Sequence, residues 1–175
     1  TYTGEAQALI NAGECTTGNM QYKLGTDGTY SANIPSATDA KTYTVYYKDA
    51  GNSNYNASDE SSITVTIGKG TATVTKAPTA KENLTYTGEA QQLVIAGESN
   101  TGSMLYKLGT DGTYSADIPT ATEAKEYAVY YKAAGNDNYN ESAEGGPVTV
   151  TINKAAGTIS YATASVSKTF GDAPF

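Results

Sequence analysis

The chain repeats itself after 84 residues, and this internal similarity constrains its fold more than any single motif does. Residues 1–62 and 85–146 are identical at 44 of 62 positions and differ at 18. One additional residue near Pro147 shifts the offset to 85, which aligns residues 63–67 with 148–152, and a third register begins at Thr169. Solenoid repeats have about 20 to 50 residues, whereas a unit of this length approaches a small domain. Each copy is therefore expected to fold by itself.

The register predicts how the chain divides. Residues 1–68 form a first repeat that lacks its first strand, residues 69–154 form a complete second repeat, and residues 155–175 supply the first strand of a third. The strand missing from the first repeat corresponds to residues 73–84 of the second. The junctions are short and contain no Ser/Gly-rich or Pro-rich linker, so neighbouring repeats are expected to stand end to end with limited bending.

Within each copy the hydrophobic pattern has a period of two, which is typical of strands. Segment 104–108 alternates in this way, segment 127–132 is predicted to point Tyr127, Val129 and Tyr131 inward, and segment 148–152 is predicted to point Val148, Val150 and Ile152 inward. The Asp-Gly pair in residues 109–112 indicates a hairpin, after which Tyr114 is expected to resume the strand. Turns recur every 8 to 12 positions, so the predicted fold is all-β, as tandem immunoglobulin-like antiparallel β-sandwiches.

Composition excludes several functions. The net charge is −7, and all 11 basic residues are lysines, because the chain contains no Arg, His or Trp. An acidic chain of this kind is not expected to bind nucleic acid or an anionic membrane. Without His there is no Ser-His-Asp or Cys-His pair, and without Arg there is no bidentate anion clamp. We therefore expect no enzyme, with no catalytic, cofactor-binding or metal-binding residue.

The sequence also lacks the signals of a disulfide or of a membrane segment. Cys15 is the only cysteine, so no disulfide can form within the chain, and no base lies near it in sequence. No apolar run approaches the roughly 18 residues that span a bilayer, and none is expected to insert into one. The chain begins at Thr1 rather than at Met, and we expect it to be part of a longer protein.

Four motifs recur in the same order in both copies. These are Tyr-Thr-Gly-Glu-Ala-Gln, Met-x-Tyr-Lys-Leu-Gly-Thr-Asp-Gly-Thr-Tyr-Ser, Tyr-x-Val-Tyr-Tyr-Lys and Gly-Asn-x-Asn-Tyr-Asn. Together they resemble the MBG family of bacterial immunoglobulin-like repeats, and residues 168–175 resemble the start of a YGX-type unit of that family. The resemblance implies a long, multi-domain surface or secreted protein of bacteria, often adhesin-like. It carries no shared catalytic residues.

The Asn-rich loops 51–56 and 135–140 are the most oxygen-rich segments, and calcium binds six to eight oxygens. However, loop 51–56 contains no carboxylate and loop 135–140 contains only Asp137. The alternative is a turn closed by bonds from Asn side chains to the backbone, with Tyr55 and Tyr139 filling the end of each sandwich. We favour the turn.

Most tyrosines recur at matching positions in the two copies, as core residues would. One pair of tyrosines falls on the outward phase of its strands and could contact a ligand. That pair is Tyr46 and Tyr130, a possible contact surface for a host glycan or protein. Most of the other matched tyrosines are expected in the core: Tyr22, Tyr43, Tyr47, Tyr106, Tyr127 and Tyr131. The lysines that could form an isopeptide cross-link all fall on the outward phase, which disfavours that reaction: Lys23, Lys48, Lys107 and Lys132.

These patterns predict a structural stalk or spacer of a bacterial cell-surface or secreted protein, whose partners are neighbouring repeats of the same protein. The alternative is a binding module that contacts a host glycan or protein. The tail alternates Ile159, Tyr161 and Val166, so it is a candidate strand donor to the first repeat of another copy, head to tail. The other explanation of the register, which we favour, is a processing cut that sets the two ends of the chain.

Overall fold

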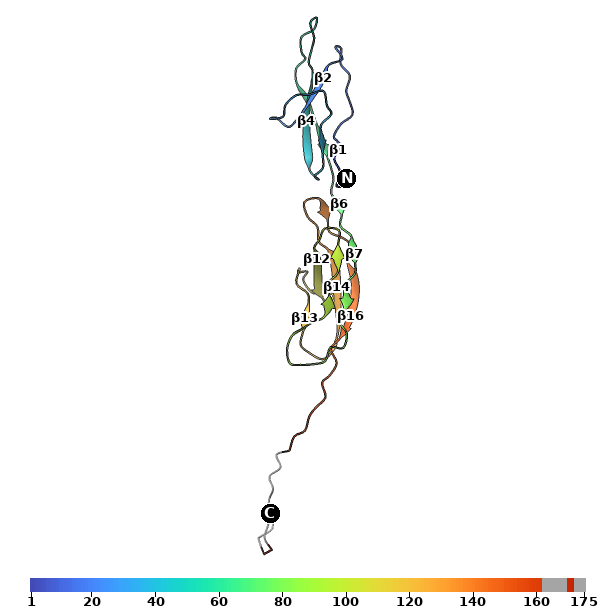
Figure 1. Cartoon of the computed structure of the whole chain (residues 1–175), viewed down its shortest axis with the longest axis vertical. Coiled ribbons are helices and arrows are strands. Elements are labelled where there is room, and N and C mark those ends of the chain that lie inside the picture. The colour runs from blue at the N-terminus through green and yellow to red at the C-terminus, as the bar shows by residue number, and fades with distance from the viewer. Residues whose placement is uncertain (162–169, 172–175) are drawn as a thin grey trace.

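The computed structural model describes residues 1–161 and 170–171, and all regular structure in them is β. This confirms the predicted all-β class. The two repeats follow one another along the long axis of the molecule, with the first repeat at the top of Figure 1 and the second below it. After residue 154 the chain leaves the second repeat at the end away from the first.

The first repeat contains five strands. Its three-stranded antiparallel sheet has the order β2(Met20–Leu24), β4(Thr42–Asp49) and β5(Ser61–Thr66), and a short pair joins β1(Gln7–Ala8) to β3(Ser36–Ala37). The central strand β4 pairs along almost its whole length, with Tyr22 opposite Tyr47 on one side and Val45 opposite Ile63 on the other.

The second repeat contains the same sheet, a counterpart of the β1–β3 pair, and three short pairs that the first repeat lacks. The sheet has the order β12(Met104–Leu108), β14(Glu126–Ala133) and β16(Gly145–Thr151), and the counterpart pair joins β9(Gln91–Gln92) to β13(Thr120–Ala121). The additional pairs are β8(Thr79–Ala80) with β10(Val94–Ile95), β7(Val74–Lys76) with β11(Glu98–Ser99), and β6(Gly70–Thr71) with β15(Tyr139–Asn140). Only the last pair is parallel. The strand predicted in residues 73–84 is thus present as β7 and β8.

Each repeat has its own hydrophobic core, formed where the inward phase of the strands meets the segment after β1 or β9. Tyr22, Tyr43, Tyr106 and Tyr127 are buried as predicted, whereas Tyr47 and Tyr131 are partly buried against the cores. The buried residues of the first core are Leu9, Tyr22, Tyr43, Val45 and Ile67. Their equivalents in the second core are joined by Ala72, Val94, Met104, Ala133 and Val150.

Two changes account for the larger second core: residues 72–84 are present there, and Ala133 replaces Asp49 of the first repeat. Ala72 belongs to the buried cluster together with Val94, Met104 and Val150, and Val74, Ala80 and Leu84 pack against that cluster. The first-repeat equivalents of Val94, Met104 and Val150 are only partly buried: Ile10, Met20 and Val65. Residues 72–84 therefore complete the second core.

The hairpin turn differs from the prediction in two respects. The positive φ lies at Gly109 (71°), the first residue of the turn, and not at Gly112 of the Asp-Gly pair. At Gly112 the constraint is space, because a Cβ would lie 2.3 Å from the carbonyl oxygen of Leu108. Tyr114 does not resume the strand, since only Ser115 bridges back, to Tyr106. The chain turns back over the sheet at this point. The Tyr114 ring therefore lies on the face of the sheet, and the Tyr114 backbone does not join the ladder of hydrogen bonds.

Candidate functional site

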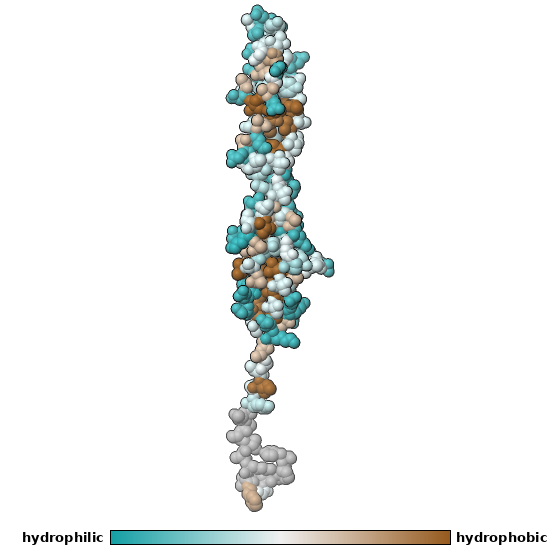
Figure 2. Space-filling model, turned by 90° about the vertical axis from the view of Figure 1, so that its right-hand side faces the viewer, coloured by the Kyte–Doolittle hydropathy of each residue, from teal (hydrophilic) through white to brown (hydrophobic). Residues whose placement is uncertain are grey.

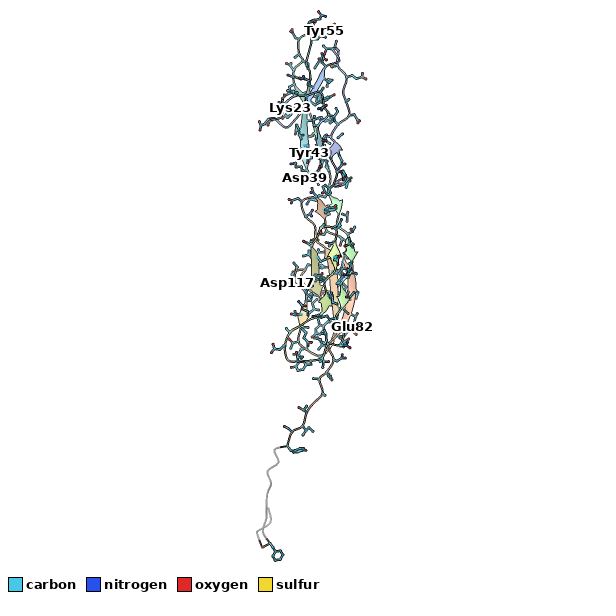
Figure 3. All side chains as sticks on the ribbon, in the orientation of Figure 1. Lys23, Asp39, Tyr43, Tyr55, Glu82 and Asp117 are labelled. Carbon is cyan, nitrogen blue, oxygen red and sulfur yellow. The ribbon has the colours of Figure 1, made fainter. Side chains whose placement is uncertain are left out.

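The junction between the repeats is a specific joint, formed by the loop before β15 and the lower end of the first repeat. The rings of Tyr2 and Tyr139 meet edge to face, with their centroids 5.2 Å apart. The Asn138 side chain accepts a hydrogen bond from the Ala40 N–H at 2.7 Å and donates one to the Asp39 carboxylate at 3.3 Å. Figure 3 shows Asp39 at this end of the first repeat. The joint thus combines an aromatic contact with the Asn138 amide group, which both accepts and donates a hydrogen bond.

The chain that connects the repeats is held in the same joint. The Gly70 N–H donates to the Asn138 carbonyl at 2.9 Å, and the Lys69 ammonium group donates to the Asn136 carbonyl at 2.8 Å. A Cβ at Gly70 would lie 3.0 Å from the Tyr139 ring, so the absence of a side chain lets the connecting strand pass close to that ring. Bending at this joint would separate the rings of Tyr2 and Tyr139 and break the contacts of Asn138 with Ala40 and Asp39.

The two Asn-rich loops are turns closed by their own side chains. The Asn52 side-chain oxygen accepts hydrogen bonds from the N–H groups of Asn54 and Tyr55, and Asn136 accepts from those of Asn138 and Tyr139. These amide oxygens therefore serve the backbone, which agrees with the turn interpretation. Among residues 1–161 and 170–171, no cluster of three or more His, Cys, Asp or Glu side chains gathers to hold a metal ion.

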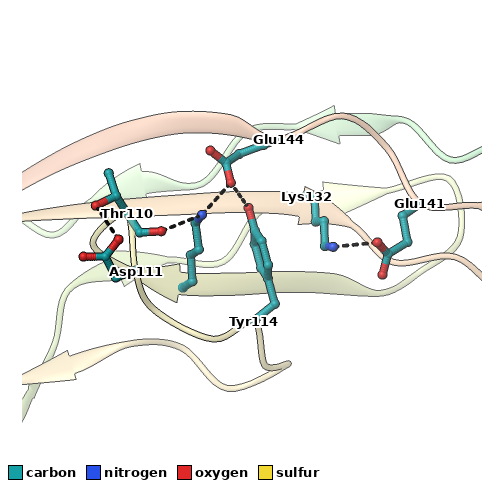
Figure 4. A network of polar contacts seen from close by, with 7 residues as sticks. Thr110, Asp111, Tyr114, Lys132, Glu141 and Glu144 are labelled. Atoms are coloured by element: carbon teal, nitrogen blue, oxygen red, sulfur yellow. Dashed lines mark hydrogen bonds and ion pairs between the residues drawn. The ribbon is translucent and has the colours of Figure 1, made fainter.

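A cluster of tyrosine, lysine and glutamate covers the outer face of each three-stranded sheet, and Figure 4 shows that of the second repeat. In this repeat the Glu144 carboxylate lies 2.7 Å from the Lys107 ammonium group and accepts a hydrogen bond of 2.6 Å from the Tyr114 hydroxyl. The Tyr114 ring lies between two cations, with its centroid 5.1 Å from Lys107 Nζ and 4.3 Å from Lys132 Nζ. This arrangement fixes the hairpin to the sheet.

The first repeat has the equivalent cluster. Lys23 lies 2.9 Å from Glu60, which also accepts a hydrogen bond from the Tyr30 hydroxyl, and Lys48 Nζ lies 4.4 Å from the Tyr30 ring centroid. Sequence reasoning placed these lysines on the outward phase but missed their tyrosine and glutamate partners. Tyr30 and Glu60 are separated in sequence by the same interval as Tyr114 and Glu144. This repeated interval is the signal that could have identified both pairs.

Each cluster shifts the pKa values of its members. Hydrogen bonds from Lys107 and then from Tyr114 lower the pKa of the Glu144 carboxyl. Partial burial, followed by the hydrogen bond to Glu60, raises the pKa of Tyr30 from 10.0 to about 12, and burial followed by the bond to Glu144 raises that of Tyr114. Both tyrosines are protonated and donate to the carboxylates at neutral pH, and the raised pKa values extend this state to more alkaline pH.

Tyr46 and Tyr130, the pair predicted as a contact surface, belong to these clusters. Both are partly buried, and their ring centroids lie 5.0 Å from Lys23 Nζ and 5.1 Å from Lys107 Nζ. Each ring thus faces a lysine from its own repeat. The two lysine side chains are only 13% and 12% exposed, because the tyrosines and glutamates cover them.

The first repeat has an open groove where residues 72–84 lie in the second. Its volume is about 430 Å³, and its apolar lining includes Leu9, Ile10, Met20 and Val65. Figure 2 shows hydrophobic residues gathered at the surface of this upper repeat. The lining also includes Asn11, Gly13 and Glu14, whose equivalents in the second repeat lie in or between β10 and β11. In the first repeat this segment forms no strand, so the groove is an open hollow with a largely apolar lining.

Two of the three predicted strand-donor residues lie in the described part of the tail. Ile159 is 84% exposed and Tyr161 is 86% exposed. Val166, the third, lies outside the described residues.

Comparisons of the chain with family models, with curated proteins and with solved structures gave no match. In the described residues there is also no helix with the length and apolarity that crossing a membrane requires.

Proposed function

We propose that this chain is a structural spacer, in which two immunoglobulin-like β-sandwich repeats stand end to end as part of the stalk of a bacterial cell-surface or secreted, adhesin-like protein. The single observation that carries the proposal is the joint. A flexible tether needs no contacts between its units, whereas here Tyr139 and Asn138 hold the second repeat against Tyr2 and Ala40 of the first. The resemblance of the repeat motifs to the MBG family supports the bacterial setting.

Two further features suit a spacer. Each repeat has its own core, so one can unfold without destroying the other. The net charge of −7 keeps exposed repeats apart from one another and in solution. We assign no catalysis to the chain, and its sequence offers neither His nor Arg for it.

Residual dipolar couplings measured by NMR test the spacer. Rigid stacking predicts that one alignment tensor fits both repeats. Tyr139→Ala removes the aromatic contact of the joint and should make the two tensors differ. Tyr55→Ala is the matched control, because Tyr55 occupies the same position in the first repeat but lies at the far end of the molecule, where it is 56% exposed (Figure 3). Independent tensors in the unmodified chain would contradict the proposal.

A further inference from the structure

Strand β5 is the outer strand of the three-stranded sheet in the first repeat, and one of its two edges is unpaired in the part of the chain that the structure describes. The Ile67 N–H donates to the Lys41 carbonyl at 3.1 Å, towards β4, whereas Gly68 points the other way and accepts the Tyr2 N–H at 2.8 Å. Backbone groups alternate sides along an antiparallel strand. Three residues of β5 therefore direct their N–H and C=O groups to the unpaired edge: Ser62, Thr64 and Thr66.

Residues 72–84 do not occupy this edge in the repeat that contains them. The equivalents of Thr64 and Thr66 are Thr149 and Thr151 in β16, which is again the outer strand of its sheet. Strands β7 and β8 pair with β11 and β10 of the other layer. Among the described residues, the preceding chain bonds to this side of the sheet only beyond β16, where the Asn153 backbone bonds Leu84 and Tyr86. The unpaired edge is thus a feature of a complete repeat.

The second repeat blocks this edge, whereas the first does not. At the offset of 85, Pro147 takes the position of Ser62, so that it presents no N–H on the unpaired side. Gly146 beside it has a φ of 102°, and the ladder shifts its register between Val129 and Tyr131. A proline and a bulge are two devices that keep edge strands from pairing. Strand β5 has neither device and no charged side chain, and all of its residues except Val65 are exposed.

We propose that the β5 edge pairs with the same edge of a second copy of this chain, antiparallel and around a two-fold axis at Thr64. In this register Thr64 lies opposite Thr64 of the second copy, and Ser62 lies opposite its Thr66. The unpaired N–H and C=O groups of all three residues then bond across the axis, and Gly68 keeps its bond to Tyr2. The contact is isologous and closes as a dimer.

The strand is complementary to itself, which identifies the occupant as a second copy. The outer face of β5 carries hydroxyl groups, and such groups already meet between strands of this sheet, where Thr42 Oγ1 lies 2.8 Å from Thr66 Oγ1. The two-fold axis brings Thr64 against its own copy in the same way. On the inner face it sets Ile63, which is 47% exposed, opposite Val65 of the second copy. No charged side chain of either strand has to leave water.

The direction of the pair has a consequence that rests on the proposed spacer role. The strands of the first repeat run along the long axis of the molecule, as β4 does in Figure 1. Antiparallel pairing therefore sets two chains side by side and pointing in opposite directions. Stalks on one surface point the same way, so the pair joins stalks that come from two facing surfaces. The first repeat is then a site of contact between cells that carry the same protein.

Sedimentation velocity over a concentration series measures the dimer. The mass should rise from 18.2 kDa to twice that value as the concentration increases. Each copy has a net charge of −7, so added salt should lower the concentration at which the rise occurs. A monomer at every concentration up to the solubility limit, at low and at high salt, would overturn the proposal.

Two substitutions in β5 should each abolish the dimer. Ser62→Pro copies Pro147 and removes one N–H from the unpaired edge, and Thr64→Lys places two ammonium groups at the two-fold axis. The matched controls are Ser62→Ala, which keeps that N–H, and Thr149→Lys, which makes the same charge change in β16. Both controls should dimerise like the unmodified chain, and circular dichroism checks that all four variants fold. Dimers that persist in Ser62→Pro and Thr64→Lys would show that another surface holds them, and would overturn the proposal.

Cross-linking tests the register. Two chains that both carry Cys15→Ala are mixed and treated with a short bis-maleimide, one with Ser62→Cys and the other, which carries a mass tag, with Thr66→Cys. The mixed product should dominate, because the Cβ atoms of directly opposed residues lie about 4.5–5.5 Å apart. Cross-linking of the Ser62→Cys chain mainly to itself would indicate parallel strands and would overturn the two-fold arrangement.

Beads that carry the chain by its N-terminal end test the contact between facing surfaces. They should aggregate, and beads that carry the Thr64→Lys variant should stay dispersed. A dimer in solution without aggregation of the beads would overturn this consequence. The alignment tensors that test the spacer role can be measured on the monomeric Thr64→Lys variant, so the spacer and the dimer can fail independently of each other.

Discussion

Alanine substitution at the equivalent glycines Gly97 and Gly13 tests whether residues 72–84 fill the groove of the second repeat while the groove of the first repeat is open. In the second repeat a Cβ at Gly97 would lie 2.6 Å from the Lys76 carbonyl oxygen and 2.9 Å from Pro78 N, both backbone atoms that cannot move without displacing the strand. At Gly13 the nearest atom is Met20 Cε at 3.1 Å, the flexible end of a side chain. Neither glycine has a positive φ, so the two substitutions differ in space alone.

Gly97→Ala is expected to destabilise the second repeat by about 1–3 kcal/mol, the usual cost of overpacking. For a unit of this size that lowers its Tm by roughly 4–8 °C for each kcal/mol. Gly13→Ala should change the stability of the first repeat by less than about 1 kcal/mol, because reduced freedom of the unfolded chain offsets the small contact with Met20.

Pulse-labelling hydrogen exchange with mass spectrometry along a urea titration reports peptides from β4 and β14 separately, at micromolar protein. Equal destabilisation of the two repeats would refute the open groove. An unchanged second repeat in Gly97→Ala would refute the packing of residues 72–84 against Gly97.

Three other predictions follow from the site. Tyr106→Phe should lower the free energy of unfolding by about 1–3 kcal/mol in chemical denaturation, because the partly buried Gly97 N–H loses its acceptor at 2.9 Å. Tyr22→Phe should lower it less, because the exposed N–H of Gly13 can bond to water instead. The raised pKa values of Tyr30 and Tyr114 mean that their contribution to stability is complete below pH 10, the pKa of a tyrosine in the unfolded chain, and is lost as the pH rises through the folded-state pKa, about 12 for Tyr30. An alkaline titration of the double Phe variant should therefore show a smaller fall in stability. Calcium should leave the Tm unchanged, because the side-chain oxygens that close the Asn loops already accept backbone N–H groups; a rise of several degrees would contradict this.

Much of the fold follows from the sequence because the strands obey a local rule. Segment 104–108 is β12 as predicted, segment 127–132 lies within β14, and the inward phase correctly predicts the buried Val129, Val150 and Ile152. The predicted strand of residues 73–84 is shorter than expected and is divided by Pro78, which has no N–H to continue the ladder.

The joint and the surface clusters could not be predicted in this way. Tyr139 and Tyr2 are far apart in sequence, and their contact depends on how one folded repeat sits on the other. The spacing of Tyr114 predicts a strand, but the turn that begins at Gly109 places it across the sheet, above Lys107. Alternation specifies which face a strand residue occupies, and it does not specify where a residue just beyond a turn will lie.

The connection through the joint has a mechanical consequence. The chain enters the second repeat along β6 and β7 and leaves it along β16, and these strands run roughly along the long axis (Figure 1). Tension applied to the ends of the repeat would pull β7 past β11 and β16 past β14, so that each ladder is loaded in shear and its hydrogen bonds must yield together rather than one by one. A row of such repeats would resist stretching by a flowing liquid until a whole repeat gives way, and the first to give way would be a repeat whose groove is not filled.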